Sequence, residues 1–377
     1  MFKNLQKRLY RDYKNLPGWR TGRRLVIIES DDWGSIRMPD LATYKKLLLK
    51  GIRVDNCPFN RFDSLASEDD LSALFEVLDS FRDVNGNPPI ITANCVVANP
   101  DFQAIRQSGY KEYHYELFTD TLQRYPNHSL SFQLWKEGME RKLFSPQFHG
   151  REHLNVSRWM QALQLGLPET RFAFDFNLFG ISTNITTEKR QSYLEAFATE
   201  NDYETEQIRD ILKDGLSLFR QIFGFSSLSF VAPNYVWPRK IEVSLAEQGV
   251  KYIQGQRLQF SHIGNEVSKV QKIPHFTGQR NAHGQIYTVR NCVFEPSLNE
   301  THDCVNECLA QIGSAFRCRK PAIITAHRVN FIGSIVQSNR EKNLKRLNEM
   351  LGIIHKKWPD VEYMSTESLG NVILDGR

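Results

Sequence analysis

Short apolar runs alternate along this chain with longer segments in which apolar residues recur every three or four positions. The first run, LVIIES at residues 25–30, is rich in branched side chains and predicts a buried β-strand. The segment 39–52 follows with helical spacing, begins at a proline and ends near a glycine, as helices commonly do. This part of the chain therefore predicts a strand followed by a helix.

The same alternation continues along the rest of the sequence. Helices are predicted at residues 67–81, 155–166, 203–222, 240–249, 302–316 and 340–358. Strands are predicted at residues 88–98, in the first part of 143–154, and at 171–177, 227–238, 251–255, 286–294, 321–328 and 361–365. Strands that alternate with helices indicate a parallel α/β sheet. Seven or eight such units without a change of composition favour one closed barrel over an open sheet.

We expect residues 25–377 to form this (β/α) barrel as a single catalytic domain, preceded by a basic helical extension at residues 1–24. Phe2, Leu5 and Leu9 fall near helical spacing in that extension, which is typical of a short amphipathic helix. Such a helix is compatible with peripheral contact with a membrane. No apolar stretch approaches the roughly 18–20 residues of a membrane-spanning helix, and the basic start lacks the apolar region of a secretory signal.

The charge and cysteine content narrow the class of protein. The net charge of +5 is small for 377 residues and no long basic run occurs, which argues against a nucleic-acid-binding protein. The six cysteines form no Cys-x-x-Cys pair, so we expect reduced thiols rather than disulfides or a structural zinc site. Together with the missing signal, this predicts a cytoplasmic protein.

Polar side chains capable of chemistry follow three of the predicted strands directly. In barrels built from parallel strands, the active site lies at the carboxyl ends of the strands. We therefore expect these side chains to meet at one rim: Glu29, Asp31 and Asp32 after the first strand, His149 and His153 near 150, and His327 with Arg328 after 326.

Each of these features is ambiguous alone. Two histidines four positions apart share one face of a helix, but His149 and His153 can have that spacing by chance. Adjacent carboxylates such as Asp31 and Asp32 also occur as helix caps or solvated turns. Combined, they are more informative, because an aspartate and two histidines can hold a divalent metal with positions open for water and substrate. A second carboxylate and an opposed histidine then supply the base and acid of an amide or ester hydrolase.

The order of these motifs resembles that of the polysaccharide deacetylases, the NodB-homology superfamily. An Asp-Asp strand end, a His-x-x-x-His loop, a Pro-aromatic turn in APNY at residues 232–235 and a final strand ending in His327 occur in that order. The resemblance implies a distorted (β/α) barrel that removes N- or O-linked acetyl groups from a carbohydrate or glycan precursor with a divalent metal, usually Zn²⁺. It covers about residues 25–330, through short motifs only.

The resemblance also implies a role for particular residues. Asp31 matches the catalytic base of the family, and His327 matches its general acid. Pro233 and Tyr235 fall where the family has a groove wall and a backbone donor for the oxyanion. The residues that match the family's metal ligands are Asp32, His149 and His153.

The chain departs from the family pattern at three points. Glu29 stands where the family usually has threonine, and Gly150 replaces the serine or threonine after the first histidine. The arginine that usually steadies the base is missing before APNY, where Val231 or Ala232 stands instead. Either Asp31 is held by another cation, for which Arg328 is a candidate, or its chemistry is altered or lost.

Aromatic residues at the strand ends are candidates for contact with a sugar, because a flat ring suits the apolar face of a pyranose. We expect Trp33, Tyr235 and Trp237 to serve in this way, and Pro233 and Arg328 to bind the substrate beside them. Two alternatives remain: a catalytically impaired metal- and sugar-binding homologue, and a glycoside hydrolase that uses Glu29 with Asp31 or Asp175 as its carboxylate pair.

Overall fold

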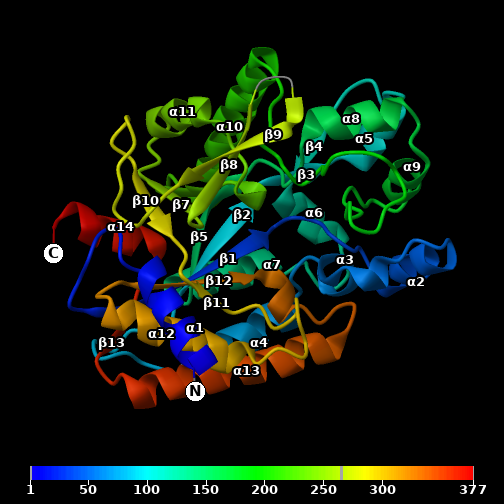
Figure 1. Cartoon of the computed structure of the whole chain (residues 1–377). Helices are drawn as coiled ribbons and strands as arrows, with labels where there is room; N and C mark the ends of the chain where they lie inside the picture. The colour runs from blue at the N-terminus through cyan, green and yellow to red at the C-terminus, as the bar shows by residue number, and fades with distance from the viewer. Residues whose placement is uncertain (1, 264–265, 377) are drawn as a thin grey trace.

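The computed structural model describes residues 2–263 and 266–376, and a curled sheet of nine strands lies at its centre (Figure 1). The order of hydrogen-bonded neighbours is β10-β7-β6-β5-β2-β1-β12-β11, and β13 pairs with the beginning of β1. The paired strands are parallel. They span Arg24–Trp33 (β1), Ile91–Val96 (β2), Phe144–Gly150 (β5), Ser229–Val231 (β6), Tyr252–Gly255 (β7), Ile286–Val289 (β10), Cys292–Val293 (β11), Ala322–His327 (β12) and Val361–Tyr363 (β13).

Helices surround this sheet, as Figure 1 shows, and two short antiparallel pairs lie outside it. The helices are Phe2–Lys14 (α1), Leu41–Leu49 (α2), Pro58–Phe62 (α3), Glu68–Asp79 (α4), Phe102–Gln107 (α5), Phe118–Arg124 (α6), Ser131–Glu140 (α7), Val156–Gln164 (α8), Pro168–Phe174 (α9), Asp202–Phe223 (α10), Glu242–Glu247 (α11), Cys304–Arg317 (α12), Gln337–Lys357 (α13) and Thr366–Leu374 (α14). The outer pairs are Ala98–Pro100 (β3) with Tyr115–Leu117 (β4) and Leu258–Ile263 (β8) with Glu266–Pro274 (β9). The predicted distorted (β/α) barrel is confirmed.

The chain between β10 and β11 connects the two edges of the curled sheet. β10 pairs with β7, and β11, only two residues further along, pairs with β12 at the other edge of the sheet. At the junction, the amide of Arg290 donates to Gly255 O and the amide of Asn291 donates to Ile323 O. Arg290 therefore sits where the two edges of the barrel meet.

Alternation along β1 divides its side chains between two environments. Val26 and Ile28 pack outward into the large core between the sheet and the helices. Leu25 and Ile27 point inward, and Glu29 and Asp31 follow them on the same face by period two. The lower part of the barrel is apolar, where α14 packs its side chains against those of β1, β7, β10 and β12: Leu25, Ile27, Tyr252, Ile286, Ile323, Leu369 and Ile373.

One predicted strand is a helix. Residues 171–177 alternate between apolar and polar side chains, but the chain forms α9 there. Pro168 occupies the first turn, where its missing N–H costs nothing, and the buried residues Thr170, Ala173 and Phe174 follow helical spacing. Asp175 therefore caps a helix rather than ending a strand of the sheet.

None of the helices in residues 2–263 and 266–376 combines the length and apolar character that crossing a membrane requires.

The apolar contact between α14 and the inside of the barrel predicts a stability effect. Leu369 is fully buried, so Leu369→Ala should lower the free energy of unfolding by about 2–5 kcal/mol. Leu374 ends the same helix and is 39% exposed, so Leu374→Ala should change it by less than about 0.5 kcal/mol. Urea unfolding followed by circular dichroism measures both, and equal midpoints for the two variants would contradict this packing.

Candidate metal and catalytic centre

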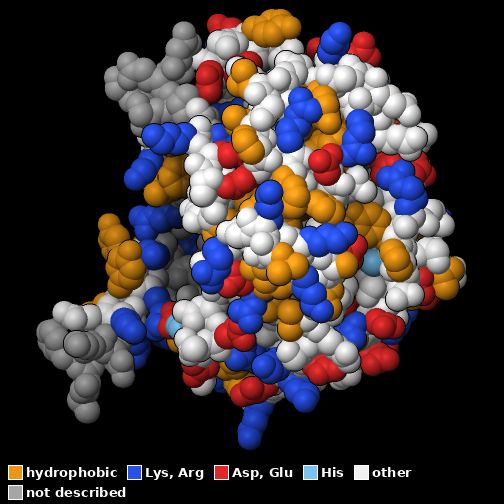
Figure 2. Space-filling model, turned by 90° about the vertical axis from the view of Figure 1, so that its right-hand side faces the viewer, with side chains coloured by type: hydrophobic (Ala, Val, Ile, Leu, Met, Phe, Trp, Pro, Cys, Tyr) orange, Lys and Arg blue, Asp and Glu red, His pale blue; other side chains and the backbone are white. Residues whose placement is uncertain are grey.

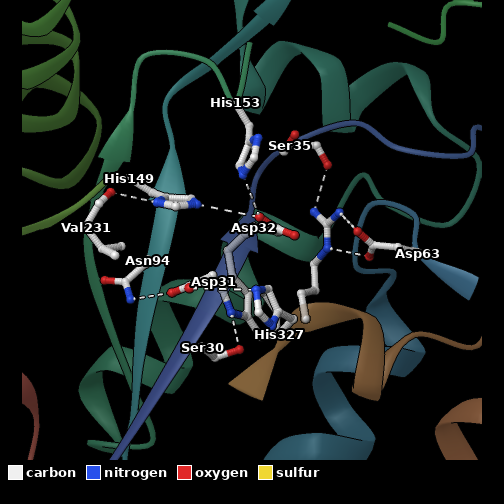
Figure 3. A network of polar contacts seen from close by, with 12 residues as sticks. Ser30, Asp31, Asp32, Ser35, Asp63, Asn94, His149, His153, Val231 and His327 are labelled. Carbon is white, nitrogen blue, oxygen red and sulfur yellow. Dashed lines mark hydrogen bonds and ion pairs between the residues drawn. The ribbon is translucent and has the colours of Figure 1, made fainter. Parts of the chain in front are cut away.

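A bulge at the end of β1 turns two adjacent carboxylates toward the same centre. Ser30 pairs with Ala93 and Trp33 with Cys95, so β1 uses three residues where β2 uses two. Asp32 takes a φ of 75°, in the left-handed region that few residues other than glycine adopt. The extra residue interrupts the alternation, and Asp31 and Asp32 therefore both reach the centre shown in Figure 3.

Asp32, His149 and His153 form a buried group whose possible ligand atoms lie within 4.8 Å of one another. The Oδ1 atom of Asp32 is 3.1 Å from Nε2 of His153 and 3.5 Å from Nε2 of His149. Figure 3 shows both imidazoles directed at the Asp32 carboxylate. A carboxylate and two imidazoles are a common protein ligand set for Zn²⁺ and similar ions.

The two histidines do not share a helical face, contrary to the expectation from their spacing. His149 lies at the end of β5, and His153 lies in the loop that follows it. Gly150 makes the sharp turn between them with a φ of 131°, and a Cβ there would stand 2.9 Å from Glu152 O. The loop, rather than helical periodicity, brings the two rings together.

The hydrogen bonding of His149 suits a metal ligand. Its Nδ1 is 2.9 Å from Val231 O, which fixes the hydrogen on that nitrogen. Its Nε2 is buried without a hydrogen-bond partner among the described residues. The lone pair of this nitrogen is therefore available to a metal ion between His149, His153 and Asp32. An orphaned buried nitrogen is costly unless something coordinates it, and the residues therefore fit a bound divalent cation.

Charge around this group also favours metal binding. Burial raises the pKa of Asp32, but the Arg37 guanidinium, 3.2 Å from its Oδ2, outweighs that effect and brings the pKa well below its usual value. Burial lowers the pKa of His153 to about 4, although Asp32 opposes the shift. At neutral pH the site thus holds an ionised carboxylate and a neutral His153, the forms that bind a metal.

Arg290 holds the two inward carboxylates of β1. Its Nη1 and Nη2 donate to the two oxygens of Asp31 at 2.6 and 2.7 Å, and its Nε donates to Glu29 at 2.6 Å. Burial alone raises the pKa of Asp31, but the guanidinium brings it well below the usual range. Asn94 adds a hydrogen bond to Asp31 at 2.8 Å. Arg290 supplies the cation that the sequence lacks before APNY.

Glu29 is a partner of Arg290 rather than part of an open site. It is fully buried, its second oxygen accepts a hydrogen bond from Thr366 at 2.7 Å, and burial raises its pKa despite the guanidinium. Glu29, which stands where the family usually has threonine, is therefore a buried partner of the arginine that holds Asp31.

His327 faces Asp31 from the neighbouring strand. Its Nε2 is 3.9 Å from Asp31 Oδ2, and its Nδ1 is 2.6 Å from Glu295 Oε1. Burial lowers the pKa of His327, but Glu295 and the two aspartates raise it to about 10. The imidazole is therefore protonated at neutral pH, with the proton on Nε2 directed at the centre.

Three of the side chains predicted to bind substrate are instead buried in contacts within the protein. Trp33 is 1% exposed and packs its ring against Trp135 and Phe144, while its indole N–H donates to Ser30. The period of the strand and the bulge at Asp32 turn it into the outer core. Trp237 is also buried, and its indole N–H donates to Glu242.

Arg328 is the third of these, and it does not hold Asp31. It is fully buried, its guanidinium donates to both oxygens of Asp63 at 3.0 and 2.9 Å, and its third group donates to Ser35 O. Each of its three nitrogens is thus engaged with Asp63 or Ser35, and none of them contacts Asp31.

Pro233 and Tyr235 lie in the turn after β6, and Tyr235 contacts Arg290. The Tyr235 hydroxyl accepts a hydrogen bond from Arg290 at 2.9 Å, and burial raises its pKa to about 12. The backbone amide of Tyr235, the donor predicted for the oxyanion, donates to Ala232 O at 3.0 Å. In this conformation the amide is therefore engaged within the turn. The substrate roles of Pro233 and Tyr235 remain predictions.

Sequence reasoning missed the residues that position the acid and the base. Arg290 directly follows the apolar run 286–289, so the search for polar residues at strand ends would have found it. Glu295 follows the apolar residues 292–294 in the same way. Arg37 lies in the loop after β1, and no pattern in the sequence marks it.

Comparisons with known proteins find the fold but no close relative. No sequence model of a protein family matches the chain, and no curated protein matches it. Similar solved structures include two proteins described as polysaccharide deacetylases. The one from Mycobacterium smegmatis has 11% identity and a TM-score of 0.47, covering 96% of this chain and 93% of that chain. The one from Pseudomonas aeruginosa has 8% identity and a TM-score of 0.45, covering 93% and 91%.

In the order of its motifs and in its fold, this chain resembles the polysaccharide deacetylases. A 4-α-glucanotransferase from Thermococcus litoralis is also similar, with 9% identity and a TM-score of 0.44; the match covers 94% of this chain but 40% of the glucanotransferase. At these TM-scores the likenesses say nothing about chemistry, and the functional conclusion rests on the geometry of the site.

The ligand set predicts stoichiometric metal binding. After dialysis against Zn²⁺, the protein should hold roughly one ion per chain, and Asp32→Asn and His153→Ala should each lose it, because three ligands converge on one point. His114, whose side chain is 41% exposed, offers a control, and His114→Ala should keep the ion. Elemental analysis measures the content. Full occupancy in Asp32→Asn would show that the ion lies elsewhere.

Proposed function

We propose that this protein is a metal-dependent hydrolase that removes N- or O-linked acetyl groups from a carbohydrate or glycan precursor. The observation that carries the proposal is the pairing of Asp31 with His327, 3.9 Å apart, beside the buried group of Asp32, His149 and His153. One member of the pair is an ionised carboxylate and the other a protonated imidazole, as a base and an acid require.

Asp32, His149 and His153 would hold the metal through Oδ1 and the two Nε2 atoms. A divalent ion bound there, expected from the resemblance to be Zn²⁺, would lower the pKa of a water molecule and polarise an acyl carbonyl. The neutral His153 and the free Nε2 of His149 support this assignment.

Asp31 is the proposed base. Arg290 and Asn94 fix both of its oxygens, so the carboxylate has one orientation and needs no reorganisation when the substrate binds. The same contacts keep the pKa of Asp31 low, so the carboxylate is ionised at neutral pH, as a base must be. Its position next to the ligand set is therefore consistent with this role.

His327 is the proposed acid. Glu295 holds its Nδ1–H and leaves Nε2–H to protonate the departing amine or alkoxide. The side chain is 24% exposed, whereas Asp31 and the three proposed ligands are almost fully buried, so His327 stands nearest the solvent side of the centre. That position suits a group that meets the leaving part of a substrate.

The two alternatives lose the observations that favoured them. The missing arginine was the reason to expect a catalytically impaired binding protein, and Arg290 supplies a cation in its place. A glycoside hydrolase needs two carboxylates that flank a substrate. Glu29 is fully buried and engaged at both oxygens, and Asp175 is an exposed partner of Arg106 on the surface.

The acid and base roles predict losses of activity. With Zn²⁺ present, the protein should release acetate from N- or O-acetylated oligosaccharides, and Asp31→Asn and His327→Ala should each lower kcat by about 10²–10⁴-fold. Asp175→Asn is the control and should leave kcat unchanged, since this side chain is exposed at the C-terminal end of α9.

Acetate assays combined with sugar chromatography separate the hypotheses. Cleavage of glycosidic bonds without acetate would favour the glycoside hydrolase, and metal and sugar binding without either product would favour the binding protein. Undiminished acetate release by Asp31→Asn would rule out Asp31 as the base.

The contact between Glu295 and His327 predicts a change of pH dependence. Glu295 raises the pKa of His327, so the acid form persists to high pH. In Glu295→Gln this pKa should fall toward its ordinary value, and the basic limb of the kcat profile should move to lower pH. A profile that keeps its basic limb while kcat falls uniformly would mean that Glu295 does not act through the charge of His327.

A further inference from the structure

Helix α1 turns an apolar stripe to solvent. Leu5, Leu9 and Tyr13 follow one another every four residues along α1, and Leu16 comes two residues after its end; the four side chains are 50%, 58%, 61% and 51% exposed. An amphipathic helix on a globular protein normally buries such a stripe. We call these four side chains the α1 stripe.

The helix is attached to the barrel by its polar face. Arg11 pairs with Glu307 at 2.6 Å, and Asn15 exchanges hydrogen bonds with Ser314 and Asn291. Asp12 accepts a hydrogen bond from Ser314 at 2.6 Å. These contacts with α12 and with Asn291, which lies between β10 and β11, fix the rotation of α1, so the exposure of the stripe follows from how the helix is attached.

Positive charge is concentrated in the same segment. Residues 1–24 contain eight basic residues and one acidic residue, whereas the whole chain has a net charge of only +5. The remainder of the chain is therefore slightly acidic. Over the face of the molecule shown in Figure 2, acidic and basic side chains are interspersed rather than gathered by sign.

Two further basic side chains lie on the side of α1 away from the stripe. Lys7 and Lys14 are exposed, and they line a cavity of about 620 Å³ beside α1 together with Arg257. Lys14 lies over the Tyr10 ring at 4.3 Å, and Tyr10 is itself 59% exposed. Tyr10 separates these two cations from the stripe, and Arg8, which is 59% exposed and one turn after Leu5, is the basic side chain that adjoins it.

We propose that α1 binds the surface of an anionic phospholipid bilayer, with the α1 stripe in the boundary between headgroups and acyl chains, Arg8 at the phosphates, and Lys7 and Lys14 adding attraction at longer range. Apolar burial and attraction to anionic lipid act together in such helices. A second copy of the chain would bring an equally basic segment against this one, so charge repulsion opposes self-association there. The proposal rests on α1 and does not depend on the catalytic function.

Vesicle co-sedimentation of the full chain tests the proposal. The protein should sediment with vesicles of phosphatidylcholine mixed with phosphatidylglycerol, less with phosphatidylcholine alone, and less at high salt, because salt screens the attraction. The variant Leu5→Glu/Leu9→Glu should weaken binding by at least about tenfold, since it places charge in the apolar boundary. Lys7→Gln/Lys14→Gln should reduce the preference for anionic vesicles.

The matched control is Leu49→Glu, at an 89% exposed leucine on α2, which should bind as the unaltered protein does. All altered positions are exposed, so circular dichroism should show unchanged folding. No binding to anionic vesicles, or equal binding by Leu5→Glu/Leu9→Glu, would overturn the proposal. Stripe-dependent dimerisation without vesicle binding would also overturn it and assign the surface to a second copy.

Discussion

The guanidinium of Arg290 holds two buried carboxylates of one strand inside the barrel. Glu29 and Asp31 are two positions apart on the same face of β1, in an interior where like charges repel strongly. Arg290 contacts both through three of its donor groups and so offsets their repulsion and part of their desolvation. Arg290 also lies between β10, which pairs with β7, and β11, which pairs with β12. The same residue therefore links the two edges of the sheet to the orientation of Asp31.

The bulge at Asp32 gives three consecutive residues of β1 different contacts. A regular strand would send Asp31 and Asp32 to opposite faces, and only one of them could reach the centre. The positive φ of Asp32 brings both carboxylates to it and turns Trp33 into the outer core. Asp31 then contacts Arg290 while Asp32 faces the two histidines, so two neighbouring identical residues have different partners and different proposed roles.

The sequence predicted the kind of fold and the residues that lie together at the site. It did not predict which other side chains contact these residues. Polar residues after apolar runs identified Asp31, Asp32, His149 and His327, because parallel strands bring their carboxyl ends to one rim. The same rule predicted that Trp33 and Arg328 bind the substrate. It failed for them because it places a residue at a strand end without fixing the direction of its side chain.

By itself, the sequence determined the alternation of strands and helices, the carboxylates and imidazoles at the strand ends, and the basic character of the first 24 residues. These are local properties, set by side-chain type and spacing. Only the tertiary structure decided that Arg290 holds Asp31, that Glu295 holds His327 and that the α1 stripe faces solvent. Each of these depends on which segments, far apart in the chain, the folded barrel brings into contact.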